Sequence, residues 1–188
     1  MRTIHSTMRP LTDDETRIFF EKLHQFIGEN IRQLVERPDE HYVFRLHNQR
    51  VYYMPEKLVR LATNMGRDNL ISMGTRFGKF SKKGDAFRLH VTALDYIARF
   101  AMHKVWVKPT SEMSYLYGQH VIKSGVGRMS EKIPQYGGVV LFSMRGVALG
   151  FGVSTHTTAA CKDLDAMGIV VLHQTDVGEY LRCEDEMF

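Results

Sequence analysis

Hydrophobic residues near the start of the chain recur at helical spacing. They lie three or four residues apart at Ile18, Phe19, Leu23, Phe26, Ile27, Ile31, Leu34 and Val35. Side chains with this spacing share one face of an α-helix. Thr12, followed three residues later by Glu15, forms a capping box, and Pro38 ends the pattern. The pattern therefore predicts a long amphipathic element between these two signals.

Shorter hydrophobic segments follow up to about residue 100. A strand hairpin is expected at 42–46 and 50–54, followed by a helix at 55–66. Three strands are expected at 70–73, 78–80 and 86–91, and a closing helix at 92–100. Pro55 is expected to start its helix, because proline is tolerated in the first helical turn. The first half is therefore expected to be an antiparallel sheet with helices.

The second half has a different texture, with ten of the fifteen glycines at or after Gly118. Short strands are expected at 104–108, 120–122, 138–142, 148–153, 169–173 and 179–182, with small helices at 112–117 and 157–164. Several short strands with glycine-rich connections are typical of a small β-barrel or sandwich. We therefore expect an α+β protein with two domains, residues 8–100 and residues 101–183.

Composition narrows the functional classes. The chain has 44% hydrophobic and 24% charged residues, as globular proteins do, and it lacks the run of ~18–20 apolar residues of a membrane span. Nine scattered histidines and two cysteines without a CxxC motif predict no metal site and free thiols. The net charge of +4 divides into +5 for residues 1–100 and −1 for residues 101–188. This balance permits an acidic partner such as RNA.

Three known catalytic or nucleotide-binding motifs are incomplete or absent in the chain. The segment 74–80 is one residue too short for a phosphate-binding loop and has Phe80 where the hydroxyl belongs. The segment 150–153 lacks the third glycine of a dinucleotide fingerprint, and the chain has no G-x-S-x-G elbow. Cys161 fits a buried, inert thiol better than a nucleophile. We therefore expect neither an enzyme nor a cofactor.

Two stretches instead suggest binding. Residues 117–127, YGQHVIKSGVG, combine a lysine with two glycines that leave the backbone open to close approach. A basic ridge, with phenylalanines interleaved at 77, 80 and 87, is formed by Arg76, Lys79, Lys82, Lys83 and Arg88. Strand alternation would turn the phenylalanines inward and the charges outward. An RNA-facing ridge and a merely solvated hairpin fit this pattern equally well.

The second half could also form a shallow groove. Its candidate members are Lys108, Lys123, Arg128, Lys132, Tyr115, Tyr117 and His120. Proteins recognise single-stranded or looped RNA by stacking bases on aromatic side chains and neutralising phosphates. Because the charge is sparse, we expect moderate affinity and help from another surface.

Long motifs now identify a resemblance. They occur in the order MRPLTDDETR, YVFRLHNQRVYY, FGKF, FRLHVTALDYI, KVWVKP, YLYGQHVIKSGVGR and GFGVS. Together they resemble the Nip-seven family of 60S ribosome biogenesis factors, from about residue 8 to about residue 182. The resemblance implies an N-terminal α/β domain for assembly-factor interaction and a C-terminal RNA-binding PUA domain, named for pseudouridine synthases and archaeosine transglycosylases.

The resemblance also implies a function and a site. It implies a non-catalytic factor that binds pre-rRNA, joins pre-60S particles with other assembly factors in the nucleolus of the nucleus, and supports rRNA processing. It would be a monomer outside the particle. The RNA-binding residues expected are Lys108, Tyr117, Gly118, Lys123, Ser124, Gly125, Gly127, Arg128, Gly168, Ile169, Leu172 and Gln174.

Two other functions remain to be compared with this one. The uncharged segment 168–172 and the near-neutral second half favour an adaptor that docks on other proteins and has little RNA affinity of its own. An RNA-modifying enzyme would need an aspartate in a cleft. Asp68, Asp85 and Asp95 occur only where turns or caps are expected.

Overall fold

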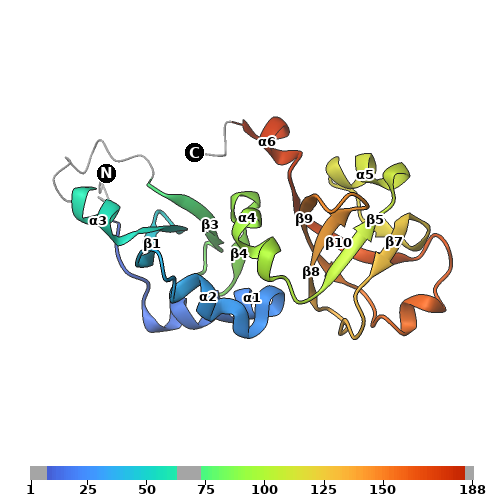
Figure 1. The fold of residues 1–188 in the computed structure, drawn as a ribbon, viewed down its shortest axis with the longest axis horizontal. Coiled ribbons are helices and arrows are strands. Elements are labelled where there is room, and N and C mark those ends of the chain that lie inside the picture. The colour runs from blue at the N-terminus through green and yellow to red at the C-terminus, as the bar shows by residue number, and fades with distance from the viewer. Residues whose placement is uncertain (1–7, 63–72, 185–188) are drawn as a thin grey trace. The chain divides into compact units, whose positions relative to one another are not determined.

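The computed structural model describes residues 8–62 and 73–184, which form two compact units. The first unit holds residues up to His24 together with Glu29–Ala93. The second holds Gln25–Gly28 and the chain from Leu94 onward. Figure 1 shows helices beside a small sheet in the first unit and a curved sheet in the second. Each unit is described by itself below.

A four-stranded antiparallel sheet organises the first unit. Its strands follow chain order: β1 (Tyr42–His47), β2 (Arg50–Pro55), β3 (Thr75–Phe80) and β4 (Phe87–Leu89). The helices are α1 (Asp13–Ile27), a 3-10 turn (Gly28–Asn30), α2 (Ile31–Val35) and α3 (Glu56–Ala62). The expected antiparallel sheet with helices is confirmed.

The start of α1 follows the sequence signal. The Glu15 amide donates to the Thr12 hydroxyl at 3.3 Å, and the Thr12 amide donates to the Glu15 carboxylate at 2.9 Å. This reciprocal pair satisfies two amides that the helix itself leaves without partners. Further along α1, the Phe19 ring packs edge-on against Phe44 and Phe87, with centroids 4.7 and 5.0 Å away. The apolar face of α1 thus fills one side of the sheet.

Turn geometry fixes the β1–β2 hairpin. Asn48 and Gln49 both have positive φ angles, 46° and 63°, as a two-residue type I′ turn requires. The expected helix start at Pro55 is wrong, because Pro55 is the last residue of β2 and pairs with Tyr42. Proline lacks an amide to donate, so it fits the end of a strand. The expected strand at 70–73 and the end of the helix at 55–66 lie largely outside the described residues.

A register shift in β3 changes one of the expected exposures. Val51 pairs with Gly78 and Tyr52 pairs with Arg76, so Phe77 is an extra residue in β3. Arg76 is consequently only 7% exposed, which corrects the outward orientation expected for the whole basic ridge. Lys79 and Arg88 remain exposed as expected. The expected closing helix is present as short helical turns over residues 91–100, including α4 (Leu94–Ile97).

The second unit contains a six-stranded sheet that nearly closes into a barrel. Its strands are β5 (Lys104–Val107), β6 (Val121–Ile122), β7 (Val126–Met129), β8 (Gly138–Ser143), β9 (Ala148–Ser154) and β10 (Ile169–Asp176), in the order β6-β10-β9-β8-β5-β7. β5 and β8 are parallel, and the other pairs are antiparallel. The 3-10 turn Lys123–Gly125 joins the two outermost strands and brings the edges together. The expected small barrel is confirmed.

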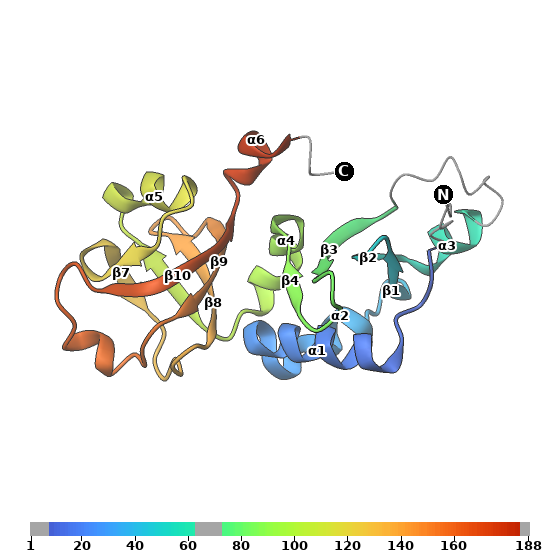
Figure 2. The same cartoon turned by 180° about the vertical axis from the view of Figure 1, so that it is seen from behind.

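Helix α5 (Pro109–Leu116) lies against one end of the barrel, as Figure 2 shows from behind. Its Tyr115 is 1% exposed and sits in the barrel core among valines such as Val105 and Val171. The buried hydroxyl can donate to the carbonyl of Phe151 at 3.0 Å or of Thr175 at 3.1 Å. Because a buried hydroxyl needs a partner, this contact fixes the helix on the sheet.

Two expected elements of the second unit need correction, and one strand was not expected. Residues 179–182 are helix α6 (Glu179–Arg182), because the Gly178 amide and the Arg182 side chain both bind Asp176 and turn the chain. The helix expected at 157–164 shrinks to the 3-10 turn Ala160–Lys162. Strand β7 was missed because its glycine breaks the alternation. Among the described helices, none has the length and apolar character of a membrane span.

Candidate nucleic-acid interface

The turn between β6 and β7 gathers several of the expected RNA-binding residues. Lys108 precedes α5, and its ammonium donates to the carbonyl of Ser124 at 2.8 Å. The Lys108 amide donates to the carbonyl of Gly125 at 2.9 Å. On the other side of the turn, the Lys123 amide donates to the carbonyl of Gly168 at 2.8 Å. These five residues therefore form one continuous site.

The ammonium of Lys123 is partly committed to this scaffold. It donates to the carbonyl of Lys162 at 2.6 Å and also to that of Leu164. An ammonium has three donors, so one remains for a ligand. Lys123 thus ties the 162–164 segment to the turn while placing a positive charge beside it.

The glycines of the turn have packing reasons of their own. A Cβ at Gly125 would lie 2.6 Å from the Ser111 hydroxyl, and a Cβ at Gly127 would lie 2.5 Å from the sulfur of Met144. Ser111 therefore packs closely against Gly125, whereas the contact at Gly127 is with the end of the half-exposed Met144 side chain. Gly118 differs, since it has a φ of 86° and nothing near its Cβ position. Glycine suits position 118 because the backbone there is left-handed, a conformation that other residues rarely adopt.

The remaining expected residues extend the site along β10. Ile169 pairs with Ile122 of β6 and is 39% exposed. Leu172 and Gln174 continue along the same strand. Between these two residues, the His173 amide donates to a ring nitrogen of His120 at 3.1 Å. Tyr117, 67% exposed at the end of α5, precedes this segment.

Arg128 belongs to a separate group on β7. It pairs with Trp106 of β5, and its guanidinium lies 4.9 Å from the Trp106 ring centroid. The Trp106 ring stacks on Phe142 with centroids 6.0 Å apart, and the Lys104 ammonium lies 5.6 Å from the Phe142 centroid. Sequence reasoning missed Trp106, Phe142 and Lys104. Alternation in KVWV could have found the first, because it turns Trp106 away from the buried Val105 and Val107.

A pocket of about 440 Å³ adjoins Lys123. Its lining is partly apolar and includes Val126, Met129, Val170 and Cys161. Burial raises the pKa of the Cys161 thiol, and the nearby Lys123 charge opposes this only in part. A thiol with a raised pKa is a poor nucleophile at neutral pH. Cys161 therefore contributes to the pocket as part of its apolar lining and not as a reactive group.

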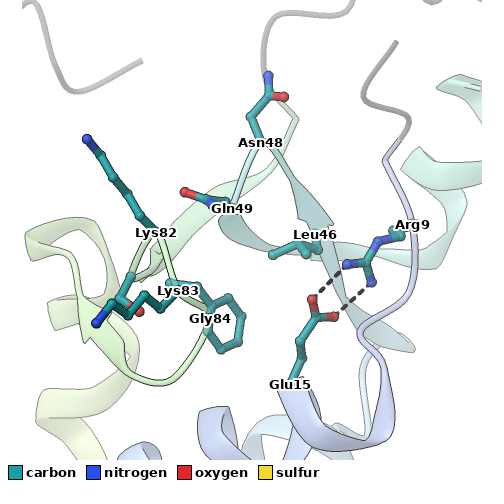
Figure 3. Close-up of a pocket in the computed structure, with 10 residues that line it drawn as sticks. Arg9, Glu15, Leu46, Asn48, Gln49, Lys82, Lys83 and Gly84 are labelled. Carbon is teal, nitrogen blue, oxygen red and sulfur yellow. Dashed lines mark hydrogen bonds and ion pairs between the residues drawn. The ribbon is translucent and has the colours of Figure 1, made fainter. Parts of the chain in front are cut away.

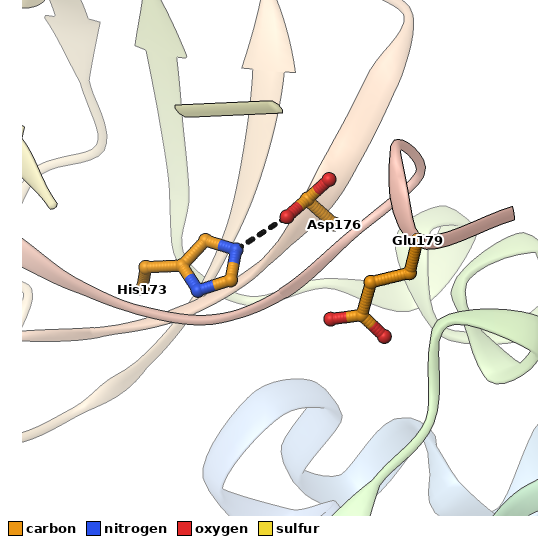
Figure 4. Close-up of side chains that lie close together, drawn as sticks. All are labelled: His173, Asp176 and Glu179. Atoms are coloured by element: carbon orange, nitrogen blue, oxygen red, sulfur yellow. Dashed lines mark hydrogen bonds and ion pairs between the residues drawn. The ribbon is translucent and has the colours of Figure 1, made fainter. Parts of the chain in front are cut away.

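Three potential metal ligands converge beside α6. Figure 4 shows His173, Asp176 and Glu179, whose ligand atoms lie within 4.8 Å of one another. The fully buried Asp176 already accepts hydrogen bonds from His173 at 2.6 Å, Arg182 at 2.8 Å and the Gly178 amide at 2.7 Å. Since a guanidinium already neutralises this carboxylate, the cluster is best explained as a charge network that anchors α6.

The basic ridge lies in the first unit, around the β3–β4 turn. Lys82 and Lys83 stand on this turn beside a depression of about 630 Å³, drawn in Figure 3. Asn48 and Gln49 of the β1–β2 turn line the same depression. Phe77, Phe80 and Phe87 are buried as expected. The ridge and the β6–β7 site thus belong to different units.

Family models match both units. Residues 8–91 match the model described as NIP7/UPF0113, pre-PUA domain, and residues 103–185 match the UPF0113 PUA domain. The chain is 62% identical over 180 residues to a Xenopus laevis protein named "60S ribosome subunit biogenesis protein NIP7 homolog", covering 96% of this chain and 99% of the relative. Relatives of the same name and coverage from Danio rerio and Mus musculus are 59% and 57% identical.

Solved structures agree on the fold. A PUA domain from Aeropyrum pernix K1 superposes with a TM-score of 0.60 at 15% identity, covering 93% of this chain and 88% of that one. A conserved PUA domain protein from Thermoplasma acidophilum gives 0.57 at 13% identity, covering 93% and 97%. At these identities the likeness supports the fold alone.

Proposed function

The chain belongs to the NIP7/UPF0113 family, and we propose that it is a non-catalytic RNA-binding assembly factor of the 60S ribosomal subunit. Relatives covering nearly the whole chain carry the name of 60S ribosome subunit biogenesis proteins. The observation that carries the RNA-binding part is the β6–β7 site, where the ammonium groups of Lys108 and Lys123 converge on one edge of a PUA barrel. Two lysine side chains placed this close together suit phosphate groups.

The proposal names an RNA ligand and a cellular location. The ligand is single-stranded or looped pre-rRNA, and the protein supports its processing inside pre-60S particles in the nucleolus. Residues 101–183 would contribute the RNA-binding domain, and residues 8–100 would contact other assembly factors. Outside the particle the protein would be a monomer without a cofactor.

Chemistry at the site supports a non-catalytic role. The buried Cys161 has a pKa raised by burial, and the Asp176 carboxylate is engaged by His173 and Arg182. A general base needs a free lone pair within reach of a substrate proton. Neither group meets the demands of a nucleophile or a base.

One observation favours a protein adaptor as a second candidate. Met167 and Ile169 are 70% and 39% exposed at the beginning of β10, beside the cationic turn. Exposed apolar side chains in a cluster are typical of protein interfaces. An adaptor would use this end of the barrel for another assembly factor and would have little RNA affinity of its own.

Charge-neutral double variants separate the two functions. Lys108→Gln with Arg128→Gln removes two charges from the barrel, and Arg32→Gln with Lys57→Gln removes two exposed charges from helices of the first unit as a control. RNA binding should weaken roughly ten-fold in the first variant alone, because two phosphate contacts are lost. If that variant binds RNA like the control but Met167→Ser with Ile169→Ser loses capture of pre-60S particles, the adaptor is correct.

A further inference from the structure

We propose that the first unit has its own RNA-binding surface, a row of cations formed by Arg50, Lys79 and Arg88. In this role the row binds successive phosphates of single-stranded RNA. The choice of RNA as the ligand rests on the proposed function, while the row itself follows from strand register.

The three cations stand directly opposite one another on adjacent strands. Arg50 of β2 pairs with Lys79 of β3, and Lys79 pairs with Arg88 of β4. His47 of β1 extends the row because it pairs with Arg50. Residues directly opposite in antiparallel strands project from the same face, and neighbouring strands lie about 4.8 Å apart. The row of cations therefore runs across β2, β3 and β4 on one face of the sheet.

The charged residues of the four strands are all basic. The four strands carry five Lys and Arg residues and not one Asp or Glu: Arg45, Arg50, Arg76, Lys79 and Arg88. Like charges directly opposite destabilise a sheet. Two acids of the unit, Glu15 and Asp39, form ion pairs with Arg9 and Arg37, which lie outside the strands. The strands themselves therefore contribute only positive charge to the sheet.

The pKa of two neighbouring groups supports this electrostatic picture. Burial, helped by the positive charges of Arg76, Lys79 and Arg50, lowers the pKa of His90 to about 4. Lys22 likewise has a pKa lowered by burial and by Arg88. Burial is the main reason that both groups are less easily charged, and the positive charges of the row act in the same direction.

Two turns prolong the row at one end of the sheet. The β1–β2 turn presents Asn48 and Gln49 next to Arg50, and the β3–β4 turn presents Lys82 and Lys83 close to Lys79, as Figure 3 shows for the turns. Asp85 on the second turn accepts a hydrogen bond from the Ser81 hydroxyl. Lysines and amides can both donate to phosphate oxygens.

The chemistry of this surface favours RNA over an acidic protein. Protein interfaces depend on apolar and aromatic anchors at their centre. Within the described strands of the first unit no large hydrophobic side chain is exposed, and the exposed ones in the described part of this unit lie on helices, Val35 on α2 and Leu58 and Leu61 on α3. A linear row of cations without apolar anchors suits the evenly spaced charges of a nucleic-acid backbone.

The test compares matched double variants of the full-length chain. Lys79→Gln with Arg88→Gln neutralises two exposed members of the row, and Arg32→Gln with Lys57→Gln removes the same charge from exposed helix positions. Binding of an unstructured single-stranded RNA is measured over a range of salt concentrations. The row variant should lower the slope of log K against log salt by about 1.4 and weaken binding roughly ten-fold near 0.1 M salt, since each phosphate contact contributes about 0.7. The control should match the wild type.

The outcomes separate this proposal from the proposed function. If the row variant keeps the wild-type slope while Lys108→Gln with Arg128→Gln weakens binding, the row is not an RNA site and the PUA interface stands. If the row variant loses binding to polyglutamate but keeps its RNA slope, an acidic protein is the partner and this proposal is overturned. Loss of RNA binding in the row variant supports the proposal whatever the barrel variant does.

Discussion

The carboxylate of Asp176, which is fully buried, accepts a hydrogen bond from the guanidinium of Arg182 at 2.8 Å. Arg182 also donates to the carbonyl of Leu116 at the end of α5. Strand β10, helix α6 and helix α5 therefore meet at one ion pair. Burial acts to raise the pKa of Asp176, but hydrogen bonds from His173 and Arg182 outweigh it and lower the pKa below its ordinary value.

Asp176→Asn should destabilise the second unit by about 2 kcal/mol, because charged hydrogen bonds are lost and Arg182 is left without its counter-ion. Urea unfolding followed by Trp106 fluorescence measures this, since Trp106 is the one tryptophan of the chain and lies in this unit. The ionised Asp176 carboxylate stabilises the fold fully above its pKa in the unfolded chain, and this contribution is lost as pH falls through its lowered folded-state pKa. Wild-type stability should therefore decline more on acidification than that of Asp176→Asn. Equal declines would contradict this role.

The Arg9–Glu15 ion pair predicts an unusual titration. Two guanidinium nitrogens of Arg9 donate to the two Glu15 oxygens at 2.7 and 2.8 Å, and this holds the Glu15 pKa at about 2 despite its partial burial. The pair's contribution to stability is thus complete above the unfolded pKa and lost as pH falls towards about 2. Carboxylate NMR should give a Glu15 midpoint near 2 that moves upward in Arg9→Met. A midpoint insensitive to that change would refute the pairing.

Gly150 marks the tightest backbone approach in the barrel. A Cβ there would lie 2.2 Å from the Thr175 carbonyl oxygen and 2.6 Å from the Tyr115 hydroxyl. Gly150→Ala should therefore cost about 2 kcal/mol of unfolding free energy through overpacking. Gly146→Asn is the control, because Gly146 has a φ of 87° with open space around it, and asparagine tolerates that conformation. Equal stability of the two variants would show that β9 shifts freely.

The pattern of hydrophobic and polar residues predicted those elements whose formation depends on local sequence alone. The capping box at Thr12 and the apolar spacing after it defined α1, and alternation found most strands. Failures came where a contact distant in sequence decided the structure. Helix α6 depends on the Asp176–Arg182 pair, and β7 is completed by pairing with β5 despite its glycine. Such partners cannot be read from local spacing.

The candidate site was harder to predict than the fold. Lysines could be located in the sequence, but the use of Lys123 to bind backbone carbonyls depends on a segment some forty residues away. Arg76 turns inward because of a register shift that no local signal marks. The cross-strand alignment of Arg50, Lys79 and Arg88 likewise needs the register of three strands. Sequence therefore indicated basic residues but not which of them act together.

The most direct test of the central claim is the salt dependence of RNA binding by the purified wild-type chain. An unstructured single-stranded RNA should bind at low salt, and log K should fall linearly with log salt, by about 0.7 for each phosphate contacted. A slope corresponding to several contacts is the predicted result. No binding at low salt, or an affinity independent of salt, would contradict the proposal that this protein binds RNA through its cationic surfaces.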